Sequence, residues 1–104
     1  MRANREKAYK LGREAASRLR VLRLANGYET AADFARAIDY RPSTYQRYER
    51  RMPIQAGPAI RLVEAIRRIA PVSLDWLYAG DPARQPRGVP GAKVAILSHA
   101  NGRR

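Results

Sequence analysis

The sequence predicts an all-α fold, a compact domain of five helices followed by a flexible tail. Apolar residues recur at helical spacing in several segments of the chain. The edges of these segments carry helix start and stop signals, among them Thr30, Ser73 and Gly80. A length of 104 residues favours one domain with one core.

The first expected helix covers residues 13–25. Asn26-Gly27 ends it, because both residues tolerate the left-handed conformation found at helix C-termini. Residues 1–12 are polar and basic and end at Gly12. We expect them to form a basic N-terminal arm, either a disordered terminus or a frayed extension of the helix.

A helix-turn-helix is expected next. The second helix begins at Thr30, which stands at capping-box spacing from Asp33, and it runs to Ile38. Asp39 can adopt the positive φ of a tight turn. The third helix begins at Pro42, since proline is favoured at a first helical position. Two short helices joined by such a turn form a helix-turn-helix.

The third helix, Pro42 to Arg50, carries the most informative chemistry. Tyr45 and Tyr48 share one face and can be held by a core. Hydroxyl and amide groups elsewhere on the helix suit base edges in a DNA major groove, and guanidinium groups suit guanine or phosphate. An ordinary amphipathic surface helix would show the same pattern. The outward-facing groups belong to Ser43, Thr44, Gln46, Arg47, Arg50 and Arg51.

Two more helices and a tail complete the chain. The fourth helix begins at Pro58, ends before Pro71 and has an apolar stripe that includes Ile69. Ser73 caps a fifth helix over 74–79. Residues 81–104 form a basic tail rich in proline and glycine. Within it, residues 92–100 could be a strand, a partner-docking segment or an apolar part of a disordered tail.

Charge narrows the choice of partners. Lys and Arg number 21 against 9 Asp and Glu, a formal net charge of +12, which points to DNA, RNA or an anionic membrane. There is no cysteine, so disulfides and cysteine metal sites are excluded. Because no apolar run could span a bilayer and the N-terminus lacks a signal-peptide core, we expect a cytoplasmic protein without a membrane partner.

Three segments, in this order, resemble the Cro/repressor (XRE-type, lambda-repressor-like) helix-turn-helix family. Residues 30–38 are similar to its positioning helix, residues 41–49 to its recognition helix with the glutamate that follows, and residues 72–80 to its common ending. The resemblance implies five helices around one core, which bind double-stranded DNA as a homodimer on a roughly two-fold symmetric operator.

The resemblance also implies roles for individual residues. Tyr45 and Tyr48 would be core residues, and Arg23 would form a structural ion pair with Glu49. Ala31 replaces a phosphate-binding glutamine, so that contact would be absent or made by Thr30 or Arg36. Arg41 replaces a serine cap, which costs about 1 kcal/mol unless another group substitutes. The expected base contacts are Pro42, Ser43, Thr44, Gln46 and Arg47, and the expected phosphate contacts are Thr30, Arg36, Arg41, Arg50 and Arg51.

Enzymatic activity is not expected. The single histidine, His99, lies in the tail, and no metal-ligand spacing, phosphate-cradling glycine loop or nucleophile–base set is present. We therefore expect no catalytic residues, no metal and no cofactor. The expected function is sequence-specific DNA binding that regulates transcription, through repression by a dimer. The alternatives are an antitoxin-like or phage-type adaptor whose tail binds a protein partner, and a nonspecific nucleoid-binding protein.

Overall fold

The computed structural model describes residues 2–86, 88 and 89, with no strand among them. The prediction of an all-α domain with five α-helices is confirmed. Residues 92–100, including His99, lie outside the described residues. The elements are α1 (Arg2–Ala25), α2 (Ala31–Ala37), α3 (Pro42–Tyr48), α4 (Ala56–Arg67), α5 (Leu74–Ala79) and a short 3-10 helix, η1 (Pro82–Arg84).

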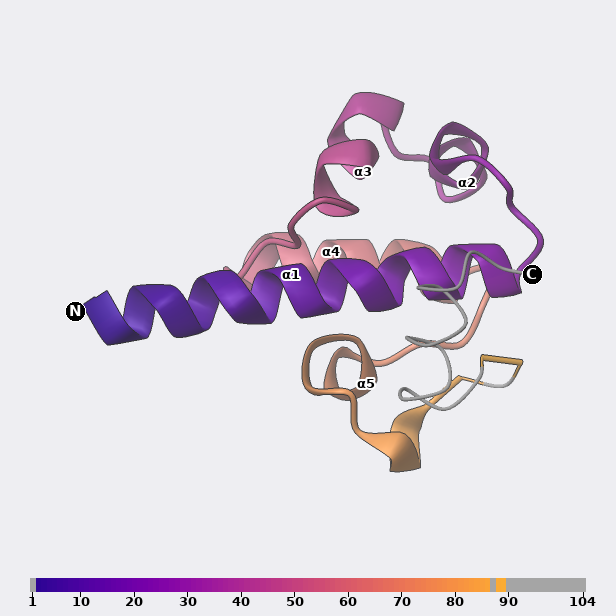
Figure 1. Cartoon of the computed structure of the whole chain (residues 1–104). Helices are drawn as coiled ribbons and strands as arrows, with labels where there is room; N and C mark the ends of the chain where they lie inside the picture. The colour runs from indigo at the N-terminus through magenta and orange to yellow at the C-terminus, as the bar shows by residue number, and fades with distance from the viewer. Residues whose placement is uncertain (1, 87, 90–104) are drawn as a thin grey trace.

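The long helix α1 organises the domain. It runs through the molecule with α2 and α3 on one side and α5 on the other, and its N-terminal half projects beyond the other helices (Figure 1). All five α-helices contribute to a single buried cluster. No helix in the described part of the chain is long and apolar enough to cross a bilayer. The largest fully buried side chains include Leu19, Phe34, Tyr45, Leu62, Ile66 and Trp76.

The turn between α2 and α3 follows from its residues. The Thr30 side chain accepts a hydrogen bond from the Asp33 N–H at 3.1 Å and so caps α2. Asp39 adopts a φ of 64°, the positive value expected from the sequence. Pro42 opens α3, while Arg41 before it makes no capping hydrogen bond through its side chain. The helix ends at Tyr48, two residues before the expected end at Arg50.

The first helix begins at Arg2, not at residue 13 as its sequence suggested. Gly12, read as a helix breaker, lies inside α1 where the α3–α4 loop crosses it. The Met52 N–H donates to the Gly12 carbonyl at 3.0 Å. A Cβ at Gly12 would lie 2.9 Å from the Met52 carbonyl oxygen, so the crossing requires glycine. The basic stretch over 2–12 is thus helical.

Three other expectations need correction. Helix α4 begins at Ala56 rather than Pro58 and ends at Arg67. Ile69 therefore leaves the helical register and is 40% exposed instead of buried. The expected tail over 81–104 also begins with ordered packing, because Val89 is buried in the core.

We predict that Gly12→Ala lowers the free energy of unfolding by about 1–3 kcal/mol, because its methyl group would force the loop away from α1. Gly57→Ala in α4 is the matched control, since its Cβ would meet no atom closer than 3.5 Å. Gly57→Ala replaces a conformationally free residue within a helix and should raise the free energy of unfolding by up to about 1 kcal/mol. Urea unfolding followed by circular dichroism measures both. Equal effects of the same sign would contradict the proposed crossing contact.

Candidate functional site

Polar and basic side chains gather on the outer side of α3 and on the residues next to it. The side chains of α3 that face away from the core are exposed or half-buried. Four arginines lie within α3 or next to it in the sequence, and none of them forms an ion pair with a carboxylate of the described residues. They are Arg41, Arg47, Arg50 and Arg51. The exposed residues are Arg41, Ser43, Gln46, Arg47, Arg50 and Arg51, and the half-buried ones are Pro42 and Thr44.

The inner side of α3 is fixed by aromatic packing. Tyr45 is fully buried, and its ring meets Phe34 of α2 edge-on at a centroid distance of 5.4 Å. Phe34 meets Tyr28 in the same way at 5.2 Å. Tyr48 is half-buried and packs against the core, as expected. Because the aromatic face is held inside, the polar residues between the two tyrosines must face outward.

A buried ion pair joins α1 to the end of α3. Arg23 Nε lies 2.7 Å from Glu49 Oε2, and Arg23 Nη2 donates to Oε1 at 3.3 Å. Each residue is only 7% exposed. Arg23 Nη1 also donates to the Tyr28 carbonyl at 2.8 Å, and the Tyr45 hydroxyl donates to Glu49 Oε2 at 2.6 Å. Since the fork geometry of a guanidinium is specific, this network fixes the orientation of α3 relative to α1.

Two tyrosines are held in their neutral form. Burial raises the pKa of Tyr45, and its hydrogen bond to Glu49 raises it further. The phenol therefore remains a donor to the carboxylate. Burial also raises the pKa of Tyr78 to about 12, with a smaller contribution from Tyr48. The Tyr78 hydroxyl donates to the Pro53 carbonyl, which ties α5 to the α3–α4 loop.

Two arginines, the half-buried Arg18 and the exposed Arg68, donate hydrogen bonds to helix ends. Arg18 Nη1 donates to the carbonyls of Leu77 and Tyr78 at 3.1 and 3.2 Å, at the C-terminal end of α5. Arg68 Nη2 donates to the Ile38 carbonyl at 3.0 Å, at the end of α2. These bonds satisfy carbonyls that have no partner within their own helix. Part of the basic excess therefore holds helices together.

The two residues of α2 expected to contact phosphate are less available than those of α3. The Thr30 hydroxyl accepts from the Asp33 N–H. Arg36 Nη1 lies 3.1 Å from Asp33 Oδ1, with both side chains well exposed. An exposed pair of this kind is weak, so Arg36 can exchange the carboxylate for another anion at little cost.

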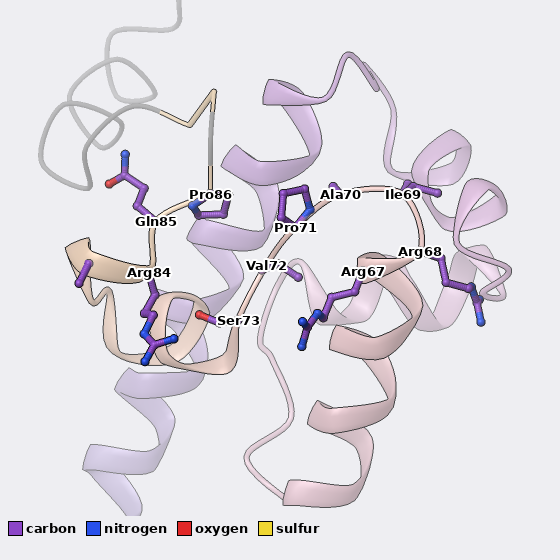
Figure 2. Close-up of a pocket in the computed structure, with 11 residues that line it drawn as sticks. Arg67, Arg68, Ile69, Ala70, Pro71, Val72, Ser73, Arg84, Gln85 and Pro86 are labelled. Atoms are coloured by element: carbon purple, nitrogen blue, oxygen red, sulfur yellow. The ribbon is translucent and has the colours of Figure 1, made fainter.

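Two hollows flank the helices. One, of about 870 Å³, lies between the N-terminal half of α1, the C-terminal end of α3 and the following loop, and Arg47, Arg50 and Arg51 line it. The other, of about 660 Å³, lies between the end of α4 and η1. Figure 2 shows Arg67 and Arg84 in this second hollow, while Arg68 points away from them.

The arrangement suits anion binding. Neither hollow is lined by an acidic residue or a histidine. Within the residues that the structure describes, no group of histidine, aspartate and glutamate side chains could hold a metal ion. Guanidinium groups beside hydroxyl and amide groups can bind phosphate and base edges.

Comparison of the chain with protein-family models, with curated proteins and with solved structures found no significant match. The resemblance to the Cro/repressor family therefore stays a prediction.

Sequence reasoning missed the residues whose partners lie far along the chain. The helix-capping bonds of Arg18 and Arg68 have no local signature. Tyr9 was also overlooked, because it lies in the stretch read as an arm. Its ring lies 4.9 Å from the Arg51 guanidinium carbon and 5.6 Å from that of Arg13. The spacing of Tyr9 and Arg13, which share a helix face, was the one available signal.

We predict that Glu49→Ala lowers the free energy of unfolding by about 3–5 kcal/mol, because it leaves the Arg23 guanidinium buried without its carboxylate. Arg36→Ala breaks the exposed pair with Asp33 and should cost less than about 1 kcal/mol. Urea unfolding of both variants provides the comparison. Losses of similar size would show that the Arg23–Glu49 pair does not constrain the fold.

We predict that the protein loses stability between pH 10 and about 12, the ordinary and the raised pKa of Tyr78. In this range the unfolded chain releases the phenolic proton that the folded chain retains, so unfolding becomes more favourable as the pH rises. Tyr78→Phe removes this titration and should make the decline shallower. Urea unfolding at a series of pH values tests this, and an unchanged slope in the variant would contradict it.

Proposed function

We propose that the protein is a sequence-specific DNA-binding regulator that reads the major groove with α3. The observation that carries the proposal is the outer side of α3. There, hydroxyl and amide side chains, which can bond to base edges, lie between arginines that have no carboxylate partner. An α-helix fits the major groove, and the side chains at its surface meet the base edges there.

The division of roles follows from side-chain type and position. Gln46 and Arg47 can each make two hydrogen bonds to a single base, with adenine and guanine respectively. Ser43 and Thr44 can bond to several bases, and Pro42 stands at the end of α3 that enters the groove. Phosphate contacts are assigned to Arg41, Arg50 and Arg51 beside α3 and to Thr30 and Arg36 on α2.

The rigid mounting of α3 supports base reading. Tyr45 and the Arg23–Glu49 pair fix the helix from within, so that little conformational freedom is lost when it enters the groove. The turn at Asp39 sets α3 against α2, as a helix-turn-helix requires. We infer that a homodimer presents two copies of α3 to an inverted repeat, and that bound dimers repress transcription by occluding a promoter in the nucleoid.

A nonspecific nucleic-acid binder is the second candidate, because exposed arginines also occur far from α3. Arg61, Arg67 and Arg84 are exposed on α4 and η1. A binder driven by charge alone would hold selected and random DNA with nearly equal affinity at physiological salt. The adaptor role expected of residues 92–100 concerns residues outside the described part of the chain and stays a prediction.

The proposal predicts different effects for two neighbouring arginines. Arg47→Ala should reduce discrimination at one base pair by about 1–3 kcal/mol, because it removes a base contact. Arg50→Ala should weaken binding to every sequence about equally and lower the salt slope by about 0.9. A duplex is first selected for tight binding by the protein. Titration of this duplex and its single-base variants at several salt concentrations measures both the discrimination and the salt slope. Identical effects of the two substitutions on discrimination would refute this division of roles.

A further inference from the structure

The hollow beside α3 has two walls that come from distant parts of the chain. One wall is the N-terminal half of α1 at Ala8 and Tyr9, and the other is the end of α3 with Arg47, Arg50 and Arg51. Figure 1 shows this half of α1 projecting past α3 instead of packing beneath it. Arg47 of α3 is among the residues that line the hollow.

The Tyr9 ring lines this hollow and lies near two guanidinium groups, of which only that of Arg51 also lines it. Tyr9 is 49% exposed, and the guanidinium carbons of Arg51 and Arg13 lie 4.9 and 5.6 Å from its ring centroid. Both distances are within the range of a cation–π interaction. Two cations on one ring repel each other, and an anion that bridges them would relieve this repulsion.

The walls are held in a fixed relation. The Met52 N–H donates to the Gly12 carbonyl at 3.0 Å, which binds the loop after Arg51 to α1. The Tyr78 hydroxyl holds the next residue of the loop, Pro53, through its carbonyl. Because the loop is anchored at both points, the backbone next to Arg51 is held against α1.

We propose that this hollow holds the sugar–phosphate backbone of the DNA that flanks the bases read by α3, with Tyr9 as a positioning residue for Arg51 and Arg13. This inference rests on the proposed function. Arg47 belongs both to the base-reading side of α3 and to the hollow, so the backbone adjoining those bases is the phosphate nearest to it.

Lys7 and Lys10 are also exposed on this half of α1. Residues one or two positions apart do not share a helix face, so these lysines stand outside the hollow that Tyr9 lines.

The test compares a selected duplex with a version trimmed by about 5 base pairs, half a helical turn, on the flank beside α1. The full-length protein should bind the longer duplex several-fold more tightly. Arg51→Ala should lower the salt slope by about 0.9 on the longer duplex only. Tyr9→Leu should weaken binding to the longer duplex about two- to five-fold, while Tyr9→Phe retains the ring and the affinity.

Arg67→Ala is the matched control, since it removes an exposed arginine at the other hollow. It should not change the difference between the two duplexes. Thermal unfolding of each variant checks that the fold is intact. The discrimination lost in Arg47→Ala reports on the proposed function separately, because it does not depend on duplex length.

Three results would overturn the proposal. Equal affinity for both duplexes would mean that the flank is not contacted. Tighter binding by Tyr9→Leu would mean that the projecting half of α1 obstructs DNA. Saturable binding of AMP that requires Tyr9, together with DNA affinity that ignores the flank, would assign the hollow to a free nucleotide.

Discussion

The buried pair of Arg23 and Glu49 is the interaction on which the rest of the structure depends. Two charges have been taken from water, and each is compensated by several bonds, from the guanidinium fork, the Tyr45 hydroxyl and the Tyr28 carbonyl. Desolvation offsets much of the attraction in such a pair, so its main consequence here is orientation rather than net stability. It sets the end of α3 against α1 and thereby decides which side of α3 meets solvent.

The remaining constraints act on the chain that follows α3. Gly12 lets the loop approach α1, and Tyr78 holds that loop to α5. Arginine has two roles in this arrangement. Arg18, Arg23 and Arg68 donate to carbonyls or a carboxylate of other elements, whereas Arg47, Arg50 and Arg51 line a hollow. The formal charge does not distinguish the two groups of arginines, but their hydrogen-bond partners do.

The sequence predicted the elements whose causes are local. Thr30 and Ser73 cap their helices, Pro42 opens α3 and Asp39 takes the positive φ of the turn. Prediction from the sequence failed where the contact that explains a residue comes from a distant part of the chain. Gly12 looks like a breaker locally, but the loop at Met52 explains it, and Arg18 and Arg68 cap helices that no local pattern connects to them. The spacing of Tyr45 and Tyr48 predicted which polar side chains of α3 face outward. The binding partner of these side chains stays a prediction, because their geometry does not identify it.

The central claim is that α3 reads bases. The most direct measurement is a binding selection from fragmented genomic DNA with the purified protein at about 150 mM salt, where nonspecific electrostatic binding is weak. Our account predicts recovery of a few fragments that share an inverted repeat. Uniform recovery of all fragments, or of none, would contradict it.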